Sequence, residues 1–577
     1  MAHQRDVTRH LARWPAPLIY LLLSVIGHLP AFRSLTTMTQ CTCRDAPQTD
    51  WFLAWTPYAL GRGWSPVQTI HLNAPDGINL MWNTLLPLPG LLMAPVTVWG
   101  NVLATHTVLA VLAFALSATT MWWVVARWAP WPPARFAAGL LYGFSPYLVA
   151  QGLDHLNLSL VALPPLVLLL LDELLVRQRR RAVLSGALLG LVALAQLLTS
   201  EEVLASTFLI CVAGLVVLFV QQRRVLTRGR VRHAVVGLGT AAGLLTLLAA
   251  PALAVQMFGA RRVTGSVTTV GDYGADLLGI VVPGPRQLFG FHGIESWGGG
   301  STENGSYLGL PLLLLLIWIT WRYRRLGVVR WAGVLAVTAW VLSLGRSLAV
   351  AGAGVGVPLP ARLWGGLPLL QDLVNVRLSL YVAAFAAVLL AVGLDRLRVD
   401  GALRRHPRRV AFITLVVVVS LLPAWPYSYQ KAEVPDYFTS SEVLRIPRDA
   451  LVLTYPVPRF PSSEPMLWQA LARYRYRSVG GYVITPDAEG HGTFQGGVTA
   501  WERAVAPAAV GRPIPLGNTA TSMLVRLELA QLQVRAIVVA DRPGAPDVVA
   551  LVTQLLGRPG ERTGGVTVWY LDAPAAL

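Results

Sequence analysis

The chain has 577 residues, of which 54% are hydrophobic and 13% charged, and its mean hydropathy is +0.54. This composition excludes an ordinary soluble globular protein, in which about 25% of residues are charged, and indicates a membrane protein with many spans. The net charge of +18 does not indicate a nucleic-acid partner, because the arginines gather in short clusters between apolar runs. Such clusters are topology signals.

The apolar runs predict an α-helical polytopic membrane protein with about eleven transmembrane helices. Most runs have about 17–23 residues, enough to cross a hydrocarbon core of roughly 30 Å. We interpret the first run as an uncleaved span, because no small-x-small cleavage site precedes Arg33. The predicted spans lie near 15–33, 104–126, 136–150, 158–175, 182–199, 202–220, 234–257, 306–320, 327–344, 376–396 and 410–426.

The arginine clusters predict the orientation of these spans. With a cytoplasmic N-terminus, every intracellular connection is rich in arginine, as the positive-inside rule requires. The long outer loops are then 34–103 and 258–305, and the tail lies outside the membrane. Residues 85–100 are short and broken by three prolines, so we interpret them as an interfacial or re-entrant segment. Nearly all the positive charge is arginine, with Lys431 the one lysine, which favours a bacterial source and the bacterial plasma membrane.

The tail differs in pattern from the rest of the chain. Short β-branched runs such as "ALVLTYPVP" and "GGVTVWYL" alternate there with amphipathic helical stretches and Gly/Pro turns. We therefore predict two domains, a transmembrane domain over 1–433 and an extracytoplasmic α/β domain over 434–577.

Polar residues gather at the predicted outer ends of the spans, where they are candidates for a functional site. The first outer loop contains "CTCRDAPQTDWFLAW", with Asp45, Gln48 and Asp50, followed by His71 and Asp76. Asp45 precedes Ala-Pro and is also compatible with a simple turn, and Asp76-Gly77 is an ordinary turn dipeptide. The CxC is compatible with a strained disulfide or with two free thiols.

The next two outer connections are short. "YGFSPYLVAQGLDHLNL" carries Asp154 and His155, and "TSEE" carries Glu201 and Glu202 at the tip of a helical hairpin. Asp154 is equally compatible with a cap on the helix that follows, and the glutamates with a solvated hairpin tip.

Two further candidates come from the C-terminal half of the helical region. Glu303 lies in "WGGGSTENG", which suits a substrate-facing loop or a flexible linker. Arg377 lies at the outer end of a span, where a guanidinium suits a phosphate headgroup because it donates bidentately and keeps its charge. The alternative for Arg377 is interfacial snorkelling. Asp172 and Glu173 lie near arginines at the inner end of a span, and we expect a local charge pair there.

The arrangement resembles the GT-C superfamily of membrane glycosyltransferases, which use polyprenyl-phosphate-linked sugars. "RDAPQTDWFLAWTPYALGRGWSP" is similar to that superfamily's acid, aromatic helix and glycine-containing turn, and "GFSPYLVAQGLDHLNL" is similar to its second-loop motif. The resemblance covers about residues 15–426, while the tail matches no family and lacks a WWDYG motif.

The resemblance implies an inverting hexosyl or pentosyl transfer from a polyprenyl-phosphate donor to an envelope glycan, lipid or protein acceptor. It implies Asp45 as general base, with Asp50 the second candidate, Asp154 as an orienting residue and Arg377 at the leaving phosphate. The implied substrate-binding residues also include Gln48, His155, Glu201, Glu202 and Glu303.

A cofactor is not identified by the sequence. A divalent ion such as Mg²⁺, Mn²⁺ or Ca²⁺ is compatible with oxygen ligands from Asp45, Asp50, Asp154 and Glu202. Alternative functions are a flippase or exporter of lipid-linked glycans and a non-catalytic envelope assembly protein.

Overall fold

The computed structural model describes residues 15–40, 45–222, 227–267, 273–297, 299–300, 302–367, 370–494, 497–517 and 519–571. The predicted CxC pair lies outside these residues. The chain forms two compact units, each assembled from three segments. The first unit comprises Met1–Arg33, Thr107–Ala249 and Val270–Ser428, and the second comprises Ser34–His106, Ala250–Thr269 and Tyr429–Leu577.

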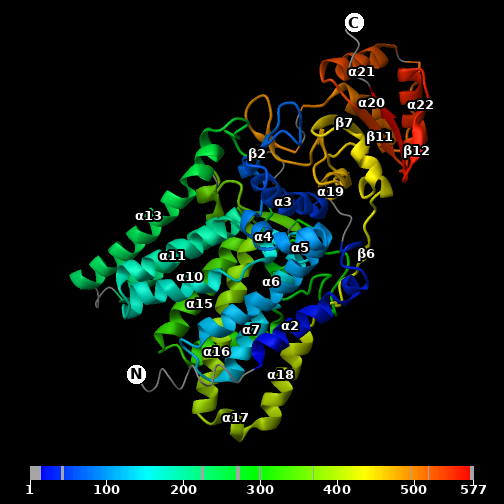
Figure 1. Cartoon of the computed structure of the whole chain (residues 1–577). Coiled ribbons are helices and arrows are strands. Elements are labelled where there is room, and N and C mark those ends of the chain that lie inside the picture. Colours follow the sequence, from blue (N-terminus) through cyan, green and yellow to red (C-terminus); the bar gives the residue numbers. More distant parts are fainter. Residues whose placement is uncertain are drawn as a thin grey trace. The chain divides into compact units, whose positions relative to one another are not determined.

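The first unit is mostly helical, and most of the predicted spans coincide with one main helix each (Figure 1). The predicted span 136–150 is instead divided between two helices, and 158–175 among three helical segments. Within the described residues, five helices are long and apolar enough to cross a membrane: Val102–Val125, Leu156–Arg177, Glu201–Gln221, Arg228–Phe258 and Asn375–Val399. These helices confirm a multi-pass membrane protein, while the total of eleven crossings stays a prediction. The main helices are α2 (Ala16–Gly27), α6 (Val102–Val125), α7 (Pro132–Gly143), α8 (Pro146–Gln151), α9 (Leu156–Ser159), α10 (Pro164–Leu171), α11 (Ala182–Leu197), α12 (Glu201–Gln222), α13 (Arg228–Phe258), α14 (Leu310–Arg322), α15 (Gly327–Ser343), α16 (Ser379–Val399) and α18 (Pro407–Leu421).

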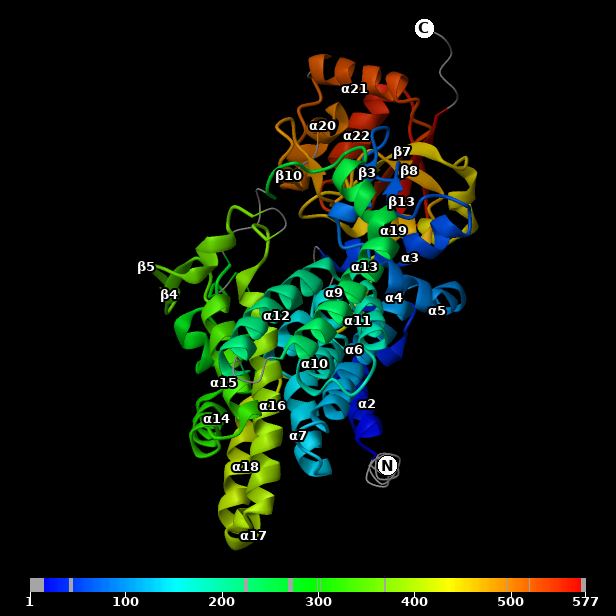
Figure 2. The ribbon, with the colours of Figure 1, turned by 90° about the vertical axis from the view of Figure 1, so that its left-hand side faces the viewer.

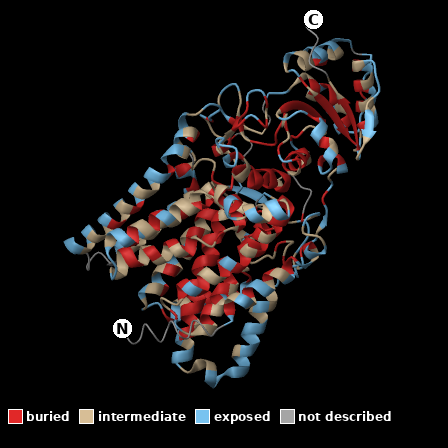
Figure 3. Cartoon of the chain, viewed as in Figure 1, coloured by how far each residue is buried: buried red, intermediate tan, exposed pale blue. Residues whose placement is uncertain are grey.

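Helix α16 forms the centre of this unit. In its candidate span, 89% of the most apolar stretch is buried, and it packs against α7, α14 and α15 (Figure 2). In contrast, only 11% of that stretch in α13 and 22% in α12 are buried, although both helices are strongly apolar (Figure 3). A helix that exposes apolar side chains all along its length is suited to lipid rather than to water.

Small residues allow α6 and α7 to pack closely. A Cβ atom added to Gly143 would lie 2.4 Å from the backbone nitrogen and the Cβ of Ala118. One turn earlier, a Cβ on Gly139 would lie 2.8 Å from the carbonyl oxygen of Ala118. Glycines four residues apart on one helix face are typical of close helix packing in membranes.

An ion cluster lies at the C-terminal end of α10, where the chain continues as a π-helical turn over Asp172–Arg177. Asp172 lies 2.7 Å from Nε of Arg127 and 3.0 Å from Nε of Arg177, and Glu173 also pairs with Arg127. The predicted local charge pairing of Asp172 and Glu173 is confirmed.

The second unit contains a five-stranded sheet with the order β12-β13-β11-β7-β8. Strands β7, β8 and β11 are parallel, and β13 and β12 are added antiparallel. This sheet confirms the predicted α/β character of the tail. The elements are β7 (Ala450–Tyr455), α19 (Glu464–Leu471), β8 (Tyr476–Ser478), α20 (Ala500–Ala509), α21 (Thr519–Gln531), β11 (Ala536–Ala540), α22 (Ala545–Leu556), β12 (Glu561–Thr563) and β13 (Val566–Tyr570).

The sheet separates two apolar cores, because successive side chains on a strand point to opposite faces. Leu451 and Leu453 of β7 join the core formed with α20, α21 and α22. Val452 joins the other core, which includes Trp468 of α19 and Phe438. An apolar core covers each face of the sheet, so every residue of β7 is buried although successive side chains point to opposite faces.

Much of the predicted first outer loop belongs to this second unit. It forms α3 (Asp45–Leu60), the short paired strands β2 (Gln68–Thr69) and β3 (Ile78–Asn79), and the helices α4 (Pro87–Leu92) and α5 (Ala94–Trp99). Helices α4 and α5 have six residues each, or about 9 Å of helix, which is too short to span a membrane. These short helices fit the interpretation of 85–100 as an interfacial or re-entrant segment, which stays a prediction.

We expect Gly143→Ala to lower the free energy of unfolding by about 1–3 kcal/mol, because the added methyl overpacks the contact with Ala118. The measurement is unfolding of detergent-solubilised protein in increasing SDS. Gly243→Ala on α13 is the matched control, since a Cβ there meets nothing within 4 Å. Equal stability of the two variants would contradict the close packing of α6 and α7.

Candidate functional site

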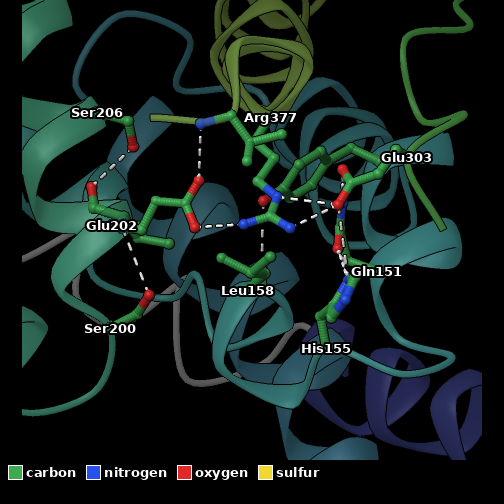
Figure 4. Close-up of polar contacts among 11 residues, drawn as sticks. Gln151, His155, Leu158, Ser200, Glu202, Ser206, Glu303 and Arg377 are labelled. Carbon is green, nitrogen blue, oxygen red and sulfur yellow. Dashed lines mark hydrogen bonds and ion pairs between the residues drawn. The ribbon is translucent and has the colours of Figure 1, made fainter. Parts of the chain in front are cut away.

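A cluster of charged side chains lies at the predicted outer end of the helical unit (Figure 4). Arg377 belongs to the 3-10 turn Asn375–Leu378 that leads into α16. Glu202 is in the first turn of α12, and Glu303 lies in the loop that precedes α14. Three segments far apart in the sequence therefore bring one guanidinium and two carboxylates together.

The guanidinium is held by both carboxylates. Nε and Nη2 of Arg377 donate to Oε1 of Glu303 at 3.0 and 2.6 Å, and Nη1 donates to Glu202. The backbone N–H of Val374 donates to the other oxygen of Glu202 at 3.4 Å. The side chain of Arg377 is 17% exposed, so it is part of a largely buried ion cluster.

A relay of hydrogen bonds extends the cluster to His155. Nε2 of Gln151 donates to Oε2 of Glu303 at 2.9 Å, and Oε1 of Gln151 lies 2.7 Å from Nδ1 of His155. A carboxylate only accepts, so the amide nitrogen must face Glu303 and the amide oxygen must face the imidazole. It follows that Nδ1 of His155 carries a proton and donates it.

Glu303 is only 5% exposed, and its charge is stabilised by these neighbours. Burial by itself raises the pKa of a carboxyl group, but attraction from Arg377 and His155 and hydrogen bonds from Arg377 and Gln151 outweigh it. The pKa of Glu303 is therefore held below its ordinary value, and the group is ionised at neutral pH.

Hydroxyl groups adjoin this cluster one turn deeper in the unit. The Tyr381 hydroxyl lies 2.8 Å from Oγ of Ser206 and 2.8 Å from Oγ1 of Thr207. Tyr381 follows Arg377 by four residues, and Ser206 follows Glu202 by four, so each pair lies on one helical face.

An apolar groove of about 120 Å³ starts at Thr207 and Tyr381 and runs between α10, α12, α15 and α16. Leu215 lines it and is 38% exposed, so the groove reaches the surface of the unit. Its other lining residues are Met121, Pro164, Pro165, Val167, Leu168, Leu171, Asp172, Leu175, Val176, Ile210, Cys211, Gly214, Leu218, Trp331, Leu335, Ala384 and Phe385.

The remaining candidates of the first unit lie near the cluster in sequence. Asp154 is half-buried in the turn between α8 and α9. It directly precedes His155, the residue at the N-cap position of α9. Glu201 is half-buried at the first residue of α12.

The candidates of the second unit lie on α3. Asp45 is its first residue and is half-buried, a position where the helix dipole favours a carboxylate. Gln48 is buried and donates to the carbonyl of Tyr482. Asp50 is 1% exposed and lies 2.7 Å from Nδ1 of His106. Burial raises the pKa of Asp50, and attraction from His106 opposes the rise.

Several residues of these networks were not predicted from the sequence. Gln151 precedes His155 by four residues inside the quoted second-loop motif, and this helical spacing was the available signal. His106 is a titratable residue in an apolar run, which is also a recognisable signal. The sequence carries no signal that would pair Tyr381 with Ser206 and Thr207.

Comparisons with known proteins identify the family and the fold of the chain. The sequence profile of the family described as "Domain of unknown function (DUF6311)" matches residues 20–419. The chain belongs to this family. No curated protein sequence matches the chain.

Solved structures show its fold. The arabinofuranosyltransferase AftD from Mycobacteria aligns with a TM-score of 0.52 at 14% identity, over 98% of this chain and 40% of AftD. A second AftD structure, of a mutant, aligns with a TM-score of 0.56 at 15% identity, over 98% and 42%. The archaeal oligosaccharyltransferase AglB from Archaeoglobus fulgidus aligns with a TM-score of 0.44 at 14% identity, over 97% and 74%. The likeness to AftD confirms the predicted GT-C fold, and at this identity it shows the fold alone. The chain spans about two fifths of the length of AftD.

We expect Glu303→Gln to lower the free energy of unfolding by about 2 kcal/mol at pH 7, because it removes a buried charge that accepts from Arg377. The pKa of Glu303 is lowered on folding, so its contribution is fully present above the ordinary value of 4.5 and is lost as the pH falls through the folded value. The difference from wild type should therefore shrink between pH 5 and pH 3. The measurement is thermal unfolding in detergent across this range.

The control for this prediction is Glu489→Gln, which changes an exposed glutamate of the second unit. We expect it to follow the wild-type curve at every pH. A Glu303→Gln effect that persists undiminished at pH 3 would show that the charge of Glu303 does not stabilise the fold.

Proposed function

We propose that the chain is a membrane glycosyltransferase that transfers a sugar from a polyprenyl-phosphate donor to an envelope glycan, lipid or protein acceptor on the outer face. The observation that carries the proposal is the apolar groove that begins beside the Arg377 cluster. Together they offer a hydrocarbon surface next to polar and charged groups, which is the chemistry of a phospholipid-like donor.

The groove suits the polyprenyl chain. Its walls come from helices of one unit and are mostly aliphatic or aromatic. Each buried CH₂ contributes about 0.8 kcal/mol, so several isoprene units bind without any specific polar contact. The hydroxyl end of the groove, at Thr207 and Tyr381, would then lie next to the phosphate.

Arg377 is the proposed partner of the donor phosphate. Three of its N–H groups are engaged by Glu202 and Glu303, which hold the guanidinium plane in one orientation. A guanidinium has five N–H donors, so a positioned arginine can hold its carboxylates and still donate to an anion. Glu202 and Glu303 are then positioning residues for Arg377, and Gln151 and His155 position Glu303.

The acid–base roles follow from the resemblance of the two outer-loop motifs to the superfamily. We propose Asp45 as the general base that takes the proton of the acceptor hydroxyl while polyprenyl phosphate leaves, and Asp154 as the residue that orients the acceptor. Asp45 is half-buried, whereas Asp50 is buried against His106. This difference favours Asp45 for contact with an acceptor and favours a positioning role for Asp50.

The residues suggested as ligands for a divalent ion do not all fit that purpose. The carboxylate of Glu202 is bound by Arg377 and by the Val374 amide, and that of Asp50 by His106. The four-residue ligand set therefore does not fit a metal centre. No step of the proposed transfer depends on an ion.

We further propose the bacterial plasma membrane as the location, with the N-terminus in the cytoplasm and the C-terminal sheet outside. This orientation rests on the arginine-rich inner connections of the sequence.

Asp45→Asn and Asp154→Asn should each reduce sugar transfer by about a hundredfold or more, because the isosteric amide neither accepts a proton nor carries charge. The measurement is transfer from a radiolabelled polyprenyl-phosphate sugar to membrane acceptors by purified, reconstituted protein. Asp50→Asn is the matched control on the same helix, and we expect it to keep at least a tenth of the activity.

Full activity of Asp45→Asn would overturn the assignment of the base. If the wild type moves the labelled lipid across vesicles but transfers no sugar, the protein is a flippase and the proposed function is wrong.

Gly214→Phe should raise the apparent KM for the lipid donor by about tenfold, because the ring fills the groove between α12 and α15. A Cβ on Gly214 lies 3.7 Å from Leu335, so the backbone accepts a side chain there. Gly243→Phe on the exposed face of α13 is the control of equal size. Unchanged kinetics of Gly214→Phe would exclude the groove as the site of the lipid chain.

A further inference from the structure

A second pocket lies entirely within the unit that contains the sheet. Its volume is about 540 Å³, within the range of about 300–1,000 Å³ that is usual for small-molecule sites. It is formed by the end of α3, the β2–β3 hairpin, the segment around Arg261 and the strands β7 and β8. Its lining residues are Trp55, Trp64, Gln68, Thr69, Ile70, His71, Asp76, Ile78, Ala260, Arg261, Asp449 and Arg477.

Aromatic rings form one wall of this pocket. The ring centres of Trp55 and Trp64 lie 5.2 and 5.4 Å from that of His71. Trp55 is buried and its indole N–H donates to the carbonyl of Pro66, whereas Trp64 is 36% exposed. Trp55 therefore fixes the wall in place, and Trp64 is the partly exposed ring that a ligand can contact.

The charged groups of the pocket compensate one another. Arg261 pairs with Asp76, and Nε of Arg477 donates to the backbone carbonyl of Asp449 at 2.6 Å. The carboxylate of Asp449 lies 3.3 Å from Nε2 of His71. Two arginines and two aspartates cancel, so the pocket has little net charge if His71 is neutral.

His71 is neutral at physiological pH. Burial lowers its pKa to about 4, and attraction from Asp449 only partly opposes this. Its Nε2 atom is buried and lies beside the carboxylate of Asp449, so the imidazole holds this acceptor in the pocket wall.

We propose that this pocket is a saccharide-binding site that holds an uncharged sugar residue. The C–H face of a sugar ring packs against the electron-rich face of Trp64, since aromatic faces attract positively polarised hydrogens. Sugar hydroxyls both donate and accept, and the wall offers both acceptors, Asp76 and Asp449, and donors, Arg261 and Arg477.

An anion fits this pocket less well. A phosphate would have to compete with Asp76 for Arg261, and Asp449 lies on the same wall. A neutral polyol, in contrast, adds hydrogen bonds without breaking the Arg261–Asp76 pair. The compensated charges therefore favour the uncharged saccharide.

Saccharide binding here does not depend on the transfer reaction. We take the bound sugar to be part of the acceptor glycan, and only this assignment rests on the proposed function. Saccharide binding and sugar transfer are separable, because binding is measured without a donor lipid.

The test is saturation-transfer NMR on the full chain in detergent, with neutral tri- and tetrasaccharides of glucose, mannose, galactose and arabinose, and with inorganic phosphate as the anion probe. We expect at least one saccharide to bind and Trp64→Ala to weaken it by about tenfold. Trp99→Ala is the matched control, since Trp99 lies on α5 in the same unit and is 86% exposed. We expect its affinity to equal that of wild type.

Gln68→Ala is a second variant that keeps the aromatic wall, and it should also weaken binding. The proposal is overturned if no saccharide binds, if Trp64→Ala and Gln68→Ala both bind as wild type does, or if phosphate displaces the saccharide. Saccharide binding that persists in an Asp45→Asn protein without transfer activity would support the pocket independently of catalysis.

Discussion

The helical unit depends on one buried ion cluster, in which the guanidinium of Arg377 is shared by the carboxylates of Glu202 and Glu303. Burying three charges in or near a membrane costs free energy unless they are paired and hydrogen-bonded, so each partner offsets the cost of burying the others. The cluster thereby connects the start of α12, the start of α16 and the loop before α14. It also fixes Gln151 and His155, whose hydrogen bonds have only one consistent donor direction.

The cluster lies beside an apolar groove, and this arrangement is the basis of the proposed function. A lipid-linked phosphate combines a hydrocarbon chain, which suits the groove, with a charged head, which suits the cluster. The GT-C fold is consistent with that arrangement, but folds of this kind host different functions, so the proposed transfer rests on the site and not on the fold. The balanced charges of the pocket in the second unit suit a different ligand, because they leave no excess of positive charge for an anion.

The sequence predicts which residues belong to the site better than it predicts the contacts among them. Glu202, His155 and Arg377 are predicted from their positions at the outer ends of apolar runs, and Glu303 from its glycine-rich loop. Their mutual contacts are not predictable, since Arg377 is separated from Glu303 by 74 residues and from Glu202 by 175. For Arg377 the sequence leaves phosphate binding and snorkelling as alternatives, and the structure adds the two carboxylates that bind it. Asp172 and Glu173 were correctly paired with arginines because those contacts include Arg177, only a few residues away.

The sequence by itself determined the membrane character of the chain, the positions of its apolar helices and the strands of its tail, because these follow from local hydropathy and from side-chain periods of 3.6 and 2. It also marked 85–100 as too short and too rich in proline to span. Only the tertiary structure decided that residues 34–106 join the unit of the C-terminal sheet, that Asp50 is buried against His106, and that Trp64, His71 and Arg477 line one pocket. These features depend on contacts between distant segments, and such contacts arise from packing and charge compensation that no local pattern encodes.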